Sequence, residues 1–127
     1  PWYNGREVSS MQKTTRNIAR RFTPRQWEVI SAVKAAARHV LPDADIILYG
    51  SRARGTAGPE SDWDFLILTD ETVTVALEET MRKAMDALSL EIAEVISAFL
   101  ENRQTWKTPL LKATPYHQAI EQEGIAV

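Results

Sequence analysis

The residues best suited to chemistry lie in two short stretches near the middle of the chain. In the first, an apolar run over residues 46–49 ends at Gly50-Ser51, and in the second, Asp62 and Asp64 open another apolar run. Side chains two residues apart in a strand point to the same face, so the two carboxylates would lie roughly 6–7 Å apart. They repel each other unless a cation lies between them. Oxygen ligands that leave positions for water and phosphate suit Mg²⁺.

The Gly-Ser turn has the chemistry of a phosphate-binding turn. Gly50 has no Cβ, so a phosphate or another backbone can approach it closely. Ser51 offers a hydroxyl and a backbone N–H, and Arg52 and Arg54 follow as cations able to bind phosphate oxygens. The alternative for each arginine is simple solvation, because arginines in polar loops are often exposed.

Length and composition indicate one ordinary globular domain. The chain has 127 residues, of which 44% are hydrophobic and 25% charged. The formal net charge of −2 is unlike that of a general nucleic-acid binder, and the absence of cysteine excludes disulfides and thiolate metal sites. No apolar run approaches the ~20 residues of a membrane span, and no signal peptide is visible. We therefore expect a cytoplasmic protein.

Residues 1–22 are predicted to be an N-terminal extension to a domain of residues 23–127. Residues 1–10 do not resemble the start of a domain; either they are an artificial addition before an initiating Met11, or they are native. The residues after Met11 are basic, which is typical of a solvated helix face, with binding of an acidic partner as the alternative. The basic residues are Lys13, Arg16, Arg20 and Arg21.

The elements that must position these residues alternate between apolar runs and amphipathic helices. This pattern predicts an α+β fold with a mixed sheet of three strands or slightly more, and helices packed against it. Residues 91–100 could continue a helix, but the polar break at residues 101–104 favours a third strand. We expect strands at 45–49, 63–69 and 91–100, a candidate edge strand at 125–127, and helices at 24–41, 72–88 and 116–123.

The two stretches together carry a family resemblance. Gly50-Ser51, a spacer of about ten residues and then Asp62-Trp63-Asp64 between apolar residues resemble the DNA polymerase β-like nucleotidyltransferase superfamily. The chain is most similar to its small single-domain members, the minimal nucleotidyltransferases. The similarity covers roughly residues 24–127, and it also favours the third strand. The competing interpretation is a hairpin whose two aspartates only cap a strand.

The resemblance implies an activity and its cofactors. A hydroxyl would attack the α-phosphorus of a nucleoside triphosphate, ATP or another, and pyrophosphate would leave. Two Mg²⁺ ions held by Asp62, Asp64 and a third carboxylate would assist, while Gly50 and Ser51, helped by the two arginines, would hold the phosphates.

The third carboxylate is expected on the next strand, where the match is less clear. Glu94 is the preferred candidate and Glu91 the second. An odd separation puts them on opposite faces of a strand, so at most one can join the aspartates. Counting back from the polar break instead places Ser97 at the expected position. In that case the third ligand is missing, and we expect a chain that binds nucleotide but transfers little.

The resemblance also suggests partners. Small members of the family are often encoded beside a helical HEPN-type ribonuclease toxin. The resemblance therefore implies an antitoxin that adenylylates or simply binds such a toxin. Larger relatives carry an extra helical domain that shapes the acceptor site. Here the acceptor would come from a partner or from a second copy of the chain. The competing function is therefore a non-catalytic interaction module.

Overall fold

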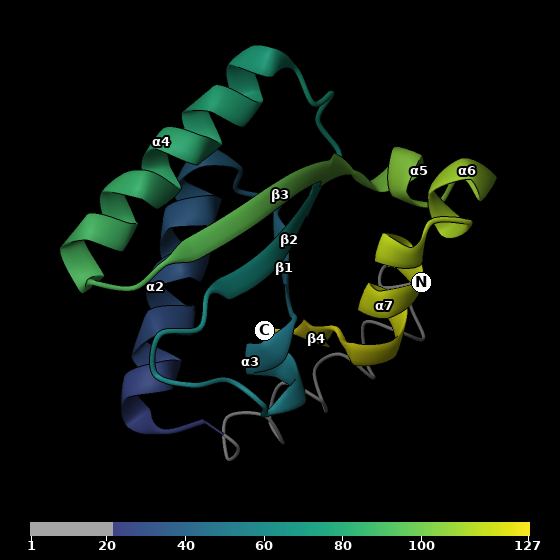
Figure 1. Ribbon diagram of the computed structural model, residues 1–127. Coiled ribbons are helices and arrows are strands. Elements are labelled where there is room, and N and C mark those ends of the chain that lie inside the picture. Colours follow the sequence, from purple (N-terminus) through teal and green to yellow (C-terminus); the bar gives the residue numbers. More distant parts are fainter. Residues whose placement is uncertain (1–21) are drawn as a thin grey trace.

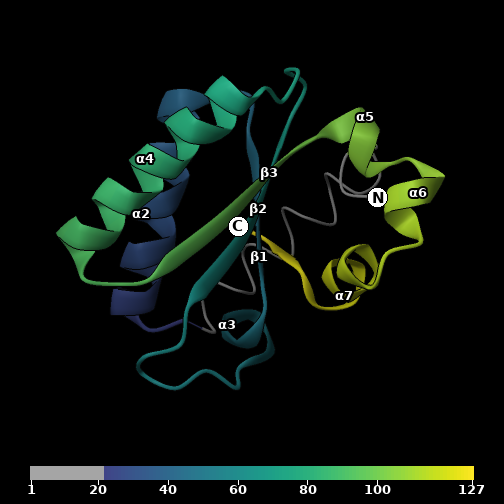
Figure 2. The same ribbon diagram turned by 45° about the horizontal axis from the view of Figure 1, so that its top comes forward.

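The computed structural model describes residues 22–127. They form a four-stranded sheet with helices on both faces, and Figure 2 shows α2 and α4 on one side and α5 to α7 on the other. The predicted extension falls outside the described residues except for Phe22, so the domain boundary at residue 23 stays a prediction. The elements, labelled in Figure 1, are α2 (Pro24–Val40), β1 (Asp45–Tyr49), α3 (Ser51–Arg54), β2 (Trp63–Thr69), α4 (Val75–Ile92), β3 (Ile96–Asn102), α5 (Arg103–Trp106), α6 (Pro109–Lys112), α7 (Pro115–Glu123) and β4 (Ile125–Ala126).

The sheet is mixed, with the strand order β3-β2-β1-β4. β2 is antiparallel to β1 and parallel to β3, and β4 is antiparallel to β1. The predicted α+β class is confirmed, and so are the bounds of β1 and β2 and the terminal edge strand. Strand β1 is central, as its apolar residues indicate.

The predicted bounds of the third strand were wrong. Helix α4 continues to Ile92 instead of ending at residue 88, and β3 starts at Ile96 instead of residue 91. The helix continues because Met81, Met85, Leu88 and Ile92 recur every three or four residues, and all four contact the core.

The end of α4 is well defined. Ala93 has a left-handed backbone (φ +55°), and its N–H donates to the carbonyl of Ser89. Glu91 therefore lies on an exposed part of a helix, and Glu94 lies in the connection between α4 and β3. Neither glutamate is a strand residue.

Threonine caps explain where α2, α4, α6 and α7 begin. Thr23 caps α2 in a capping box with Gln26, and Pro24 is the first residue of the helix, as the predicted helix at 24–41 requires. Helix α4 begins after Thr74, later than expected, and α7 begins after Thr114. Two short helices, α5 and α6, follow β3 and begin after Asn102 and Thr108.

Both faces of the sheet are covered, so β2 is buried along nearly its whole length. Trp63, Phe65 and Ile67 face the larger core cluster, which includes the buried residues of α2 and α4. Leu66 and Leu68 face the opposite cluster, which α5 and α7 complete with Trp106 and Ile120. No helix in the described part of the chain is long and apolar enough to cross a membrane.

One arginine joins the ends of three strands. Arg103, only 12% exposed at its side chain, lies 2.9–3.1 Å from carboxylate oxygens of Asp43, Asp45 and Asp70. Burial raises the pKa of the Asp43 carboxyl, but hydrogen bonds from the Asp70 N–H, Thr69 and Arg103 outweigh it, so the net pKa is lowered. This cluster fixes the end of β3 against the start of β1.

Candidate active site

The turn after β1 brings a glycine against a carboxylate. Tyr49, the last residue of β1, pairs with Asp64 of β2, so Gly50 follows directly beside that aspartate. Gly50 has a positive φ of +76°, and a Cβ at this position would lie 2.5 Å from Oδ2 of Asp64. Only glycine satisfies both the backbone and the space at this point.

The two aspartates lie together at the start of β2. Asp64 is half-buried, whereas Asp62 precedes the strand and is exposed. Burial raises the pKa of the Asp64 carboxyl and Asp62 raises it further, while Arg54 lowers it and Glu123 raises it. The net pKa is raised, because burial and the two neighbouring carboxylates together outweigh the effect of Arg54. This is the electrostatic environment in which a bound cation is favourable.

A third acidic side chain, Glu123, reaches this site from the C-terminal end of α7. Its Oε1 accepts a hydrogen bond of 3.1 Å from the Gly50 N–H, and its two oxygens lie 3.1 and 2.9 Å from the Arg54 guanidinium. Sequence reasoning missed Glu123, because 73 residues separate it from Gly50 and no local pattern marks it.

The two arginines of the turn have different partners. Arg52 donates to the carbonyls of Ser61 and Pro59, and its guanidinium carbon lies 4.6 Å from the ring centroid of Trp63. It therefore holds the loop between α3 and β2 against the sheet. Arg54 is paired with Glu123 instead. Ser51 is the first residue of α3, beside Gly50. Nucleotide contacts by these residues stay predictions.

The residue that lies beside Asp64 on β3 is Ser97, whereas Glu94, the preferred candidate for the third carboxylate, makes other contacts. Ser97 of β3 pairs with Asp64, so it occupies the position beside the aspartates. Glu94 accepts a hydrogen bond of 3.3 Å from the Trp63 indole and lies 3.9 Å from Arg25 of α2. Trp63 and Asp64 point to opposite faces of β2, so these contacts hold Glu94 on the α2 side of the sheet.

Within residues 22–127, no group of three or more His, Asp or Glu side chains is arranged to hold a metal ion. Asp62 and Asp64 are therefore the acidic pair around which a metal site can be proposed, and Ser97 is the β3 residue that pairs with Asp64.

Comparison with known proteins identifies the family. A family model described as a nucleotidyltransferase domain matches residues 29–119. That match spans more than half of the chain, so the chain belongs to this nucleotidyltransferase family, as the sequence resemblance predicts. The family supports assignment to the transferases. No curated protein gives a match.

Two crystal structures contain chains of similar fold. One, of a toxin-antitoxin with AMP-PNP, contains a chain 18% identical, covering 76% of this chain and 69% of that chain, with a TM-score of 0.54. The other, of a mutant of the toxin-antitoxin MntA-HpeT, contains a chain 17% identical, covering 74% and 68%, with a TM-score of 0.52. At these identities the likeness concerns the fold.

Replacing Gly50 should cost more stability than replacing Gly55, which also has a positive φ. Gly50→Ala adds both a left-handed backbone and an overlap with Asp64, whereas Gly55→Ala adds only the backbone term, because nothing lies within 4 Å of its new Cβ. We expect Gly50→Ala to lose about 1–3 kcal/mol more free energy of unfolding than Gly55→Ala. Urea denaturation of both variants measures this, and equal losses would contradict the close approach to Asp64.

Proposed function

We propose that the chain binds a nucleoside triphosphate, with ATP the expected one, together with a divalent cation, and transfers its nucleoside monophosphate to a hydroxyl of a partner. The observation that carries this proposal is the Asp62/Asp64 pair beside the Gly50-Ser51 turn, in a chain of the nucleotidyltransferase family. The similar fold that was crystallised as a toxin-antitoxin with AMP-PNP supports the nucleotide assignment.

The residues present suit one divalent cation better than two. The raised pKa of Asp64 reflects burial and the neighbouring Asp62 carboxylate, and a cation between the two would relieve that cost. Asp62 and Asp64 would hold such an ion, with further oxygens from the triphosphate and water. A second ion would lack the third carboxylate, since Ser97 stands beside Asp64.

The reaction itself is a displacement at phosphorus. A bond forms between the acceptor oxygen and the α-phosphorus, the bond from that phosphorus to the pyrophosphate oxygen breaks, and the hydroxyl proton is lost to solvent. A bound divalent ion would lower the pKa of the attacking hydroxyl and neutralise charge on the leaving group. The protein would contribute the fixed positions of Asp62, Asp64 and the Gly50-Ser51 turn.

Phosphate binding at the turn requires Glu123 to move. Its carboxylate uses the Gly50 N–H and the Arg54 guanidinium, two groups that would otherwise bind phosphate oxygens. An incoming triphosphate would take over these donors and release Glu123, which is repelled by the added negative charge. We therefore place Arg54, more than Arg52, against the phosphates.

A second function, nucleotide binding with little transfer, is favoured by Ser97. The metal that activates an attacking hydroxyl depends on protein ligands more than the nucleotide-bound metal does. The chain would then act mainly as the antitoxin-type partner of a toxin, of the helical HEPN type that the family resemblance suggests. The similar folds in toxin-antitoxin structures support a toxin partner. A second copy as partner and a cytoplasmic location stay predictions.

Triphosphate binding should depend on both Mg²⁺ and the aspartates. We expect calorimetry to give heat for ATP with Mg²⁺, and an affinity at least about tenfold weaker for Asp62→Asn/Asp64→Asn, because the metal loses both carboxylates. Binding should also weaken on acidification before an ordinary carboxyl would titrate, since the pKa of Asp64 is raised and protons compete with the metal. Equal affinities for both proteins would refute the metal site.

Adding a carboxylate beside Asp64 should increase transfer. Ser97→Asp would supply the missing third ligand, and we expect transfer of labelled AMP to a co-purified toxin to rise about tenfold or more. Ser97→Asn is the matched control, because asparagine has the shape of aspartate without its negative charge. A native rate that is already high, with no gain in Ser97→Asp, would mean that two carboxylates suffice.

Removing the charge of Glu123 should strengthen triphosphate binding. Glu123→Gln frees Arg54 from its ion pair and removes a negative charge near the phosphates, so we expect affinity for ATP to rise roughly tenfold. Glu121→Gln, on the same helix, is the control, and its affinity should stay unchanged. Weaker binding by Glu123→Gln would indicate that the glutamate contributes to the site directly.

A further inference from the structure

The outer edge of the sheet at β3 is open and lacks the usual protection. Among the described residues, β3 pairs with β2 alone. Natural edge strands are usually protected by lysine, proline, a bulge or short length. Residues 96–102 contain no lysine or proline, pair with β2 in unbroken register, and extend over seven residues. An edge of this length and composition is suited to pairing with another chain.

The unpaired backbone groups on this edge can be identified. The Trp63 N–H donates to the Val95 carbonyl at 2.8 Å. Alternate residues of a parallel strand bond to the same neighbour, so odd-numbered residues of β3 bond to β2. The N–H and C=O groups of Ala98 and Leu100 therefore point to the open edge, and no hydrogen bond joins them to another described residue.

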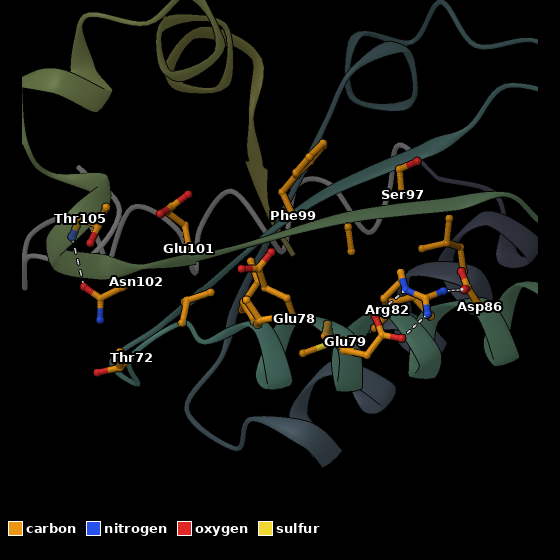
Figure 3. A pocket seen from close by; sticks show the side chains of 17 residues that line it. Thr72, Glu78, Glu79, Arg82, Asp86, Ser97, Phe99, Glu101, Asn102 and Thr105 are labelled. Carbon is orange, nitrogen blue, oxygen red and sulfur yellow. Dashed lines mark hydrogen bonds and ion pairs between the residues drawn. The ribbon is translucent and has the colours of Figure 1, made fainter.

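A groove of about 1040 Å³ follows this edge, between β3 and α4. Its apolar lining includes Met81, Met85 and Ile96, and Phe99, at 56% exposure, provides an aromatic side chain at the rim. Figure 3 shows α4 running along β3, with Glu78 and Arg82 rising from the helix and Phe99 and Glu101 projecting from the strand. An extended segment lying here could bond to the open N–H and C=O groups of β3 and also contact the apolar side chains of the groove.

The charge of the groove is acidic. Its lining includes the carboxylates of Glu78, Glu79, Asp86 and Glu101 and one guanidinium, that of Arg82. Arg82 is already bonded to Glu79 and to Asp86, the latter at 2.7 Å. Glu78 and Glu101 have no cation partner among the described residues. Burial and then Glu78 raise the pKa of the Glu101 carboxyl, a cost that an incoming cation would relieve.

We propose that this groove binds an extended segment of a partner protein that carries lysine or arginine and adds as a further strand to β3. The main-chain groups of Ala98 and Leu100 would supply hydrogen bonds, as in other cases of strand addition. Glu78 and Glu101 would select basic side chains. A second copy of β3 fits poorly, because it would bring the same carboxylates against each other. The groove shares Ser97 with the proposed nucleotide site, because this residue lines the groove and also pairs with Asp64. The groups that would bind the partner segment, those of Ala98, Leu100, Glu78 and Glu101, have no role in the proposed nucleotide chemistry.

The test uses a capped ten-residue peptide of alternating lysine and valine as the probe, with an alternating glutamate and valine peptide as its counterpart. We expect the basic peptide alone to bind in fluorescence anisotropy. Glu78→Lys/Glu101→Lys should weaken it at least about tenfold, because the attraction becomes repulsion. Glu28→Lys/Glu60→Lys, with the same change of net charge outside the groove, should bind within a few-fold of the native chain.

Amide hydrogen exchange distinguishes strand addition from loose charge attraction. The basic peptide should slow exchange at Ala98 and Leu100 in the native chain. Equal weakening by the two double variants, or unchanged exchange at these amides, would overturn the proposal. So would concentration-dependent self-association of the native chain that protects the same amides, since the edge would then belong to a second copy. If the Glu78→Lys/Glu101→Lys variant loses its folded circular-dichroism signal, Glu78→Gln is used instead. The Glu78 side chain is exposed, so this change leaves the core intact.

Discussion

The site depends on the contact between Gly50 and Asp64. The antiparallel pairing of β1 and β2 places these two residues side by side, and the space between them is too small for even one methyl group. The same contact fixes the start of α3, and therefore Ser51 and Arg54, relative to the aspartates. The turn proposed to bind phosphate and the aspartates proposed to bind a cation are adjacent because the backbone of Gly50 meets the side chain of Asp64 directly.

The C-terminal part of the chain contributes to this site as well as to the core. Helix α7 packs on the sheet face opposite α2 and α4, with Tyr116 within 6 Å (ring centroids) of Tyr49, Phe99 and Trp106. This packing carries Glu123 to the Gly50 N–H. A negatively charged side chain thus already occupies donors that suit phosphate. In the proposed function, this carboxylate would couple nucleotide binding to the position of the end of α7.

The two edges of the sheet differ in how they are used. On one side, β4 follows α7 directly and adds two residues to β1. On the other side, β3 has its end anchored by Arg103 but its outer backbone groups open. Arg103 and the three aspartates that it contacts lie at the opposite end of β3 from Ser97, so the groups that anchor this strand are not part of the proposed nucleotide site. The proposed docking groove and the proposed nucleotide site meet at Ser97.

The sequence alone determined the features that depend on neighbouring residues. Thr23-Pro24 starts α2, the apolar runs define β1 and β2, and the Gly-Ser turn with its aspartate pair marks the family. Tertiary structure decided the rest. Whether residues 89–92 continued the helix or began a strand depended on the contacts of Leu88 and Ile92 with the core. The register of β3, which sets Ser97 beside Asp64, and the arrival of Glu123 both depend on packing between segments distant in sequence, and short-range patterns carry no record of such contacts.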